Sequence, residues 1–140
     1  MNLQNILLEL GPEIEKYGVI CDAENKFAEK NFQLLKEKGV YKALIPAELG
    51  GGGVLYSELC YFLKDLAQHC PSTSLALSMH MHLVAVLVFK HSNGDEAATK
   101  TLKAVVEKDL ILLSTGGGDW VSSNGTAKKV DGGYRITCKK

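Results

Sequence analysis

Hydrophobic residues are densest over positions 72–89, STSLALSMHMHLVAVLVF, a stretch that contains no Asp, Glu, Lys or Arg. Its length and its many Ala, Leu and Met residues predict a helix rather than a strand, beginning at Ser72 or Thr73 and ending near His91. Because this helix is hydrophobic on nearly every face, we expect other helices or lipid to surround it. The serines and histidines within it argue against lipid. We therefore predict the central helix of a soluble helical domain, and no membrane span.

Two amphipathic segments precede this central helix. A stripe of Leu and Ile at three- and four-residue spacing covers 3–17, and Gly11-Pro12 is expected to divide it into two short helices. The next helix is predicted over 22–38, where hydrophobic and charged residues lie on different faces. Asp22 is its expected N-cap, and Gly39 is the expected left-handed residue after its end.

The segment 40–56 combines Pro46 with four consecutive glycines at 50–53. Such a composition is common in flexible linkers, because glycine permits many backbone conformations. However, the residues around Pro46 are too hydrophobic for a solvated tether. We therefore predict an ordered loop that packs on the helices.

Two more helices complete the helical part of the chain. One is expected from its cap Ser57 to about residue 69, with Leu and Phe facing inward. The other follows the predicted cap Asp95, after Asn93-Gly94 has ended the central helix. Four or five helices of this length, joined by short loops, predict an antiparallel bundle over 1–109.

The remaining segment, 110–140, has the pattern of β-structure. A short hydrophobic run at 110–114 is predicted to form a strand, and 126–138 reads as a hairpin whose turn contains Asp131-Gly132-Gly133. Three strands close neither a barrel nor a sandwich, and they leave an unprotected edge. The fold class is therefore predicted to be mainly α: an N-terminal helical bundle followed by a short, incomplete β segment.

Composition narrows the possible functions. Sixteen basic and sixteen acidic residues give no net charge, so neither nucleic acid nor an acidic membrane surface is an expected partner. The four cysteines form no CxxC pair, and the acidic start of the chain is unlike a signal peptide. We expect a cytoplasmic protein with reduced thiols. His80 and His82 would lie on opposite sides of a helix, so we expect no metal site.

Several short motifs occur in a recognisable order along the chain. They are the segment GVYKALIP at 39–46, ELGG at 48–51, Leu66-Ala67, the uncharged stretch 72–89, the helix led by Asp95, GYRI at 133–136, and Lys139. Together they cover most of the chain, and in order and spacing they resemble the N-terminal portion of the acyl-CoA dehydrogenase family.

This resemblance implies a helical N-terminal domain, a β domain and a C-terminal four-helix domain, usually assembled as a homo-oligomer. It also implies FAD as the cofactor and an acyl-CoA thioester as the substrate, which loses two hydrogens from its α and β carbons. A glutamate takes the α proton, and flavin N5 accepts hydride from the β carbon. We expect that glutamate beyond Lys140, so we predict no catalytic residue within this chain.

The resemblance implies that Ile111, Leu113 and Ser114 bind the cofactor. The Ser114 hydroxyl would hydrogen-bond the isoalloxazine, whose reduced form gains negative charge that nearby donors stabilise. Alternatively, this hydroxyl is satisfied by backbone at a strand end. The following residues, TGGGDW at 115–120, lack the family's usual Glu-Pro and the serine before Asp119. The substrate class therefore stays open, and related flavin-dependent monooxygenases and nitroalkane oxidases are alternatives.

The resemblance also implies that the central helix lines the acyl pocket. The substrate-binding residues that we predict on this helix are Ser74, Leu75, Ser78, Met79 and His82. Helical spacing places the last four on one side, which makes a shared wall geometrically feasible. The alternative is that these residues only fill the core of the bundle.

The function predicted from the sequence is that of the N-terminal part of an FAD-dependent acyl-CoA dehydrogenase-like oxidoreductase. We expect the 140-residue chain alone to be inactive. An alternative is a non-catalytic helical module for binding or oligomerisation, in which exposed strands pair with a second chain.

Overall fold

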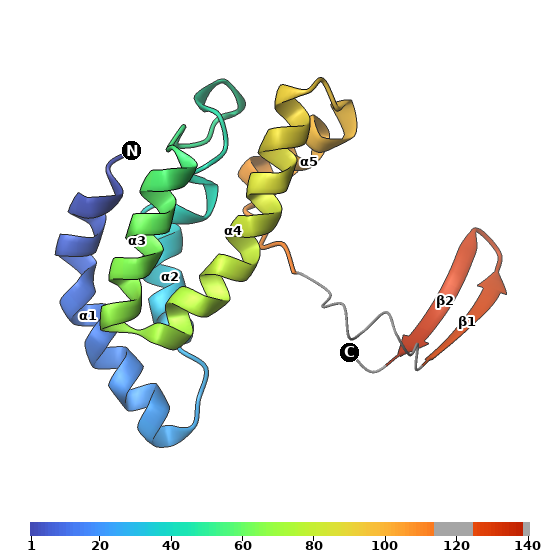
Figure 1. The fold of residues 1–140 in the computed structure, drawn as a ribbon. Coiled ribbons are helices and arrows are strands. Elements are labelled where there is room, and N and C mark those ends of the chain that lie inside the picture. The colour runs from blue at the N-terminus through green and yellow to red at the C-terminus, as the bar shows by residue number, and fades with distance from the viewer. Residues whose placement is uncertain (114–124, 139–140) are drawn as a thin grey trace.

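The protein is described from a computed structural model that covers residues 1–113 and 125–138. Within these residues the chain forms five α-helices, with two short 3-10 turns between the second and third, and one β-hairpin. The helices are α1 (Leu3–Glu24), α2 (Glu29–Glu37), α3 (Tyr56–His69), α4 (Pro71–Ser92) and α5 (Glu96–Lys108). Figure 1 shows α3 between α1 and α4, and α5 beside the C-terminal end of α4. The predicted class is confirmed: a mainly helical domain followed by a short β segment.

One continuous hydrophobic core holds the helices together. Its fully buried side chains include Ile14 of α1, Leu35 of α2, Phe62 of α3, Leu77 of α4 and Leu102 of α5. The stripe predicted on α1 faces this core, and so do most of the Leu and Phe side chains predicted to point inward on α3. These two helices therefore bury the faces that their own sequence patterns select.

The prediction that Gly11-Pro12 divides the first segment was wrong, because α1 continues through both residues. Pro12 lies on the exposed side of α1, so water can reach the Leu8 carbonyl that loses its hydrogen bond. Gly11 is buried beside the ring of His69, and a Cβ at this position would lie 2.6 Å from the His69 Nε2. This glycine therefore permits close packing of α1 on the end of α3.

The predicted boundaries of the second helix were also wrong at its start. Asp22 belongs to α1, which ends only at Glu24, and α2 begins at Glu29. Asn25 ends α1 in the left-handed conformation with φ of 56°, which asparagine tolerates better than most residues. Gly39 does adopt the expected left-handed conformation after α2, with φ of 70°.

The segment 40–56 is an ordered, packed loop, as predicted. Val40, Ala43 and Ile45 are fully buried within it, around the turns η1 (Val40–Lys42) and η2 (Ala47–Leu49). The glycine run folds back on this buried part, because the backbone N–H groups of residues 52–54 donate to carbonyls of residues 42–45 at 2.9 Å. The loop is thus a fixed wall of the domain rather than a linker.

The N-cap predicted for α3 was wrong, and the N-cap predicted for α5 is confirmed. Ser57 is not the cap of α3, which begins at Tyr56; instead the Glu58 carboxylate accepts the Leu55 N–H at 3.0 Å. Asp95 is the N-cap of α5, where its Oδ1 accepts the Ala98 N–H at 3.0 Å.

Replacing Asp95 with alanine is expected to lower the free energy of unfolding by about 1 kcal/mol, because the first turn of α5 loses its side-chain acceptor. Urea denaturation followed by circular dichroism measures this change. Asp95→Asn keeps an acceptor oxygen and should lose much less. Equal losses in the two variants would contradict the capping role.

The predicted hairpin is confirmed. Strands β1 (Gly125–Val130) and β2 (Gly133–Cys138) pair antiparallel, and Asp131-Gly132 forms the turn, with Gly132 at φ of 80°. All residues of both strands are exposed, and Figure 1 shows them away from the five helices. The strand predicted at 110–114 is not formed over 110–113, and Ser114 lies outside the described residues.

The prediction that α4 is surrounded on nearly every face was wrong. One face packs on α3 and α5, but the other exposes large hydrophobic side chains: Leu75 (68%), Met79 (44%), Val86 (50%) and Phe89 (70%). By length and composition alone α4 could cross a membrane, since its mean hydropathy reaches 1.6. Its buried face, however, carries Thr73, Ser74 and His80, all hydrogen-bonded within the helical domain.

Candidate functional site

His80 joins three parts of the chain at the middle of α4. Its side chain is 1% exposed. Its Nε2 donates to the Tyr41 carbonyl at 2.9 Å, and its Nδ1 accepts the Leu112 N–H at 2.9 Å. These two bonds require the neutral ring with its proton on Nε2, because a protonated Nδ1 accepts no hydrogen bond. Burial lowers the pKa of His80 and so favours the same neutral form.

This arrangement fixes the backbone that follows α5. The Leu112 N–H, which a strand would have offered to a neighbouring strand, is held by His80 instead. The two residues beside it, Ile111 and Leu113, are those predicted to contact a flavin. Sequence reasoning considered His80 only as a metal ligand and missed this role. The helical spacing of His80 from Leu77 and Val84, which are both buried, could have indicated that the His80 side chain faces inward.

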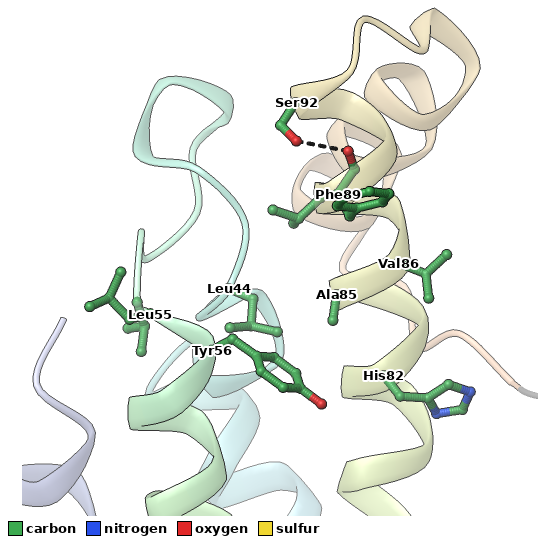
Figure 2. Close-up of a pocket in the computed structure, with 10 residues that line it drawn as sticks. Leu44, Leu55, Tyr56, His82, Ala85, Val86, Phe89 and Ser92 are labelled. Atoms are coloured by element: carbon green, nitrogen blue, oxygen red, sulfur yellow. Dashed lines mark hydrogen bonds between the residues drawn. The ribbon is translucent and has the colours of Figure 1, made fainter.

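A hydrophobic pocket of about 620 Å³ lies between the loop before α3 and the last turns of α4; we call it the loop–α4 pocket. Its lining residues are Leu44, Val54, Leu55, Tyr56, His82, Ala85, Val86, Val88, Phe89 and Ser92. Figure 2 shows Leu44 and Tyr56 pointing across the space toward Ala85 of α4. The fixed loop thus supplies one wall of this pocket and α4 the other.

A second hydrophobic pocket, of about 500 Å³, lies between α2, α4 and the segment after α5; we call it the α2–α4 pocket. Its lining residues are Phe27, Glu29, Phe32, Gln33, Lys36, Tyr41, Ala76, Met79, Ile111, Leu112 and Leu113. His80 holds one of its walls in place through the bond to Leu112.

Four of the predicted site residues line these two pockets. Ile111 and Leu113, predicted to bind cofactor, share the α2–α4 pocket with Met79, predicted to bind substrate. His82 lines the loop–α4 pocket. Ser114 lies outside the described residues. The roles assigned to all of them remain predictions.

The other predicted substrate residues lie elsewhere on α4. Ser74 is buried against α3, where its hydroxyl donates to the Leu63 carbonyl at 2.7 Å. The Ser78 hydroxyl donates to the Leu75 carbonyl of the same helix at 2.7 Å, and the Leu75 side chain is exposed. Of these three, Ser74 serves the packing of the bundle, while Leu75 and Ser78 lie outside the linings of both pockets.

The remaining reactive groups form no further centre among the described residues. No group of three or more His, Cys, Asp or Glu side chains comes together there in a way that would hold a metal ion. Cys70 precedes α4 and is buried. Burial favours its neutral thiol, but hydrogen bonds from Ser72 and Thr73 outweigh this effect and lower the pKa of Cys70 below its ordinary value.

Comparison with known proteins agrees with this helical fold. Residues 10–109 match the family described as acyl-CoA dehydrogenase, N-terminal domain. The match covers most of the chain and all or part of every helix, from α1 to α5. The chain therefore belongs to the acyl-CoA dehydrogenase family, through its N-terminal helical domain.

Three curated relatives carry names of the same kind. The chain is 25% identical to the mitochondrial isovaleryl-CoA dehydrogenase of Oryza sativa subsp. japonica over 91% of its length. It is 28% identical to benzylmalonyl-CoA dehydrogenase of Aromatoleum aromaticum over 91%, and 23% identical to a putative acyl-CoA dehydrogenase of Bacillus subtilis over 94%. The chain spans only about a third of the length of these relatives, 32%, 35% and 36%.

Proposed function

We propose that this chain supplies the N-terminal domain of an FAD-dependent oxidoreductase that removes two hydrogens from the α and β carbons of an acyl-CoA. The family match over residues 10–109 carries this proposal. Support also comes from α4, whose outer face leaves large hydrophobic side chains uncovered beside a hydrophobic pocket. Such a surface suits an acyl chain and a further domain packed on it.

The residues present fit a flavin at the end of the helical domain. Ile111 and Leu113 expose hydrophobic side chains, 45% and 86%, on which an aromatic ring could pack. Their backbone N–H groups make no hydrogen bond with any other described residue, so they are free to donate to ring oxygens and nitrogens. When bound, FAD supplies a two-electron acceptor for the hydrogen leaving the β carbon.

The chain's own residues would orient the acyl group and exclude water. The loop–α4 pocket offers Leu44, Ala85 and Phe89 for the hydrocarbon part of the substrate. His80, through the Leu112 N–H, would keep the cofactor-side backbone in place relative to α4. We assign proton abstraction to a glutamate of a different domain.

The proposal extends to assembly and location. We propose a homo-oligomer, because the exposed face of α4 and the open edges of the hairpin need cover. We also propose a cytoplasmic protein, since all four cysteines lie among the described residues and are unpaired.

The decisive experiment compares two polypeptides. The reading frame downstream of codon 140 is sequenced, and any continuous frame is expressed in full beside residues 1–140 alone. The full product is expected to purify yellow, with flavin absorbance that bleaches when an acyl-CoA is added without an electron acceptor. Residues 1–140 are expected to be colourless and inactive. A colourless full-length product that holds no FAD after reconstitution would overturn the proposal and favour a non-catalytic helical module.

A further inference from the structure

The β-hairpin gathers positive charge on one of its two faces. Side chains alternate along a strand, and residues paired across two strands point to the same side. The pairing of β1 with β2 therefore places Thr126, Lys128, Val130, Arg135 and Thr137 on one face, which we call the cationic face. Lys128 lies directly opposite Arg135, and the next pair on this face is Thr126 with Thr137. Two cations and two hydroxyls thus lie side by side, with no acid among them.

The pairing of Lys128 with Arg135 weakens the hairpin unless an anion joins it. Like charges directly opposite each other on neighbouring strands repel. Both side chains are exposed, and neither forms an ion pair with an acid of residues 1–113 or 125–138. The whole chain balances sixteen basic against sixteen acidic residues, but the hairpin holds three basic residues and a single acid, Asp131 in the turn. A bound anion would remove this repulsion.

The other face of the hairpin has a different character. It carries Ala127, Tyr134 and Ile136 together with Lys129. Tyr134 and Ile136 are 68% and 69% exposed, and hydrophobic side chains of this size are the ones that pack on further protein. An antiparallel sheet commonly packs its hydrophobic face and leaves its polar face in water. The cationic face is therefore the one that stays open to a dissolved ligand.

The donors of the cationic face match a phosphate group. The guanidinium of Arg135 offers paired N–H donors whose spacing fits two oxygens of one phosphate, and the Lys128 ammonium adds a point charge. The hydroxyls of Thr126 and Thr137 can donate to further oxygens. A phosphate group brings about two negative charges and three acceptor oxygens, so it can neutralise both cations at once. A carboxylate has a single charge and would neutralise only one of them.

We propose that the cationic face of the hairpin binds a phosphate or diphosphate group between Lys128 and Arg135, with the hydroxyls of Thr126 and Thr137 as further donors. An inorganic anion and a nucleotide both supply this chemistry, and the test below separates them. The site uses no residue of either hydrophobic pocket. Binding requires neither flavin nor acyl-CoA, so the inference stands or falls independently of the proposed oxidoreductase function.

The test is an NMR titration of the 140-residue chain with inorganic diphosphate at constant ionic strength. Amide signals of the hairpin should shift with one common Kd. Lys128→Gln and Arg135→Gln should each weaken binding about fivefold or more, because each removes a charged hydrogen-bond donor to the ligand. Lys129→Gln is the matched control, since it removes the same charge from the adjacent residue on the opposite face. This variant should change the Kd less than about twofold.

The outcomes separate a built site from general charge attraction. Lys128→Gln also relieves the repulsion across the strands, so weaker binding in this variant cannot come from a less stable hairpin. A parallel titration with ADP identifies the source: tighter binding of ADP indicates a nucleotide, and equal binding indicates the diphosphate group alone. Equal losses in Lys128→Gln and Lys129→Gln would overturn the proposal. Hairpin signals that do not shift to saturation with either anion would overturn it as well.

Discussion

Replacing His80 with alanine is expected to lower the free energy of unfolding by about 3 kcal/mol, equivalent to a fall of roughly 15 °C in Tm. The substitution removes two hydrogen bonds at once and leaves the Tyr41 carbonyl and the Leu112 N–H without their partner. It also leaves a cavity where a fully buried ring had been. Thermal unfolding followed by circular dichroism measures the effect.

His82 provides the matched control for this experiment. It lies two residues further along α4 and is exposed, and its one hydrogen bond within the described residues joins its Nδ1 to the Ser78 carbonyl at 3.3 Å. His82→Ala should change stability by less than about 0.5 kcal/mol. Amide hydrogen exchange adds a local measurement, since protection of the Leu112 N–H should disappear in His80→Ala. Persistent protection there would show that His80 does not hold this segment.

The same histidine should make stability depend on pH. Burial lowers the pKa of His80 in the folded state below the ordinary 6.5, so the unfolded chain binds its proton first as pH falls. Its contribution is therefore complete above about pH 6.5 and is lost as pH falls from there toward the lower folded-state pKa. His80→Gln lacks the titrating group, while His69, His82 and His91 remain. The difference in stability between the parent protein and this variant should shrink on acidification, and a constant difference would contradict the prediction.

The features that sequence predicted well are those set by local chemistry. Asp95 caps α5 because its carboxylate reaches an N–H only three residues away. Gly39 and Gly132 take left-handed conformations that most other residues avoid. The hydrophobic stripe of α1 faces the core because helical spacing alone selects that face. None of these features depends on distant parts of the chain.

The features that sequence missed depend on solvent exposure and on contacts with distant parts of the chain. Pro12 was expected to break α1, yet a proline on the exposed side of a helix leaves a carbonyl that water can satisfy. The hydrophobic run at 110–113 looked like a strand, but its Leu112 N–H is used by a histidine far away in sequence. In both cases the environment in the folded protein overrides the local secondary-structure preference of the sequence.

The candidate site was predictable only in part, for a related reason. Because α4 is hydrophobic on nearly every face, its sequence could not reveal which face the bundle would leave exposed. Met79 and His82 were expected to share one wall, but they line different pockets.

The glycine run that folds back on residues 42–45 gives the second large expected effect. Gly51→Ala should lower the free energy of unfolding by about 3 kcal/mol, the upper part of the range for added volume in packed regions. A Cβ at Gly51 would overlap the carbonyl oxygen and Cβ of Ile45, far inside the 3.0 Å that real Cβ atoms keep. Ile45 is fully buried and its backbone is held by the Gly53 N–H, so the chain has little room to adjust.

Gly53→Ala is the matched control, because it tests backbone strain without a clash. Gly53 has φ of 61°, but an added Cβ would meet nothing closer than the Ala47 N at 3.7 Å. Its cost should therefore be about 1 kcal/mol. Gly51→Ala should also remove hydrogen-exchange protection of the Val54 N–H, which bonds the Ala43 carbonyl at 2.9 Å. If Gly51→Ala proved no more destabilising than Gly53→Ala, the close packing of the glycine run on Ile45 would be refuted, and with it the fixed wall that this loop gives to the pocket.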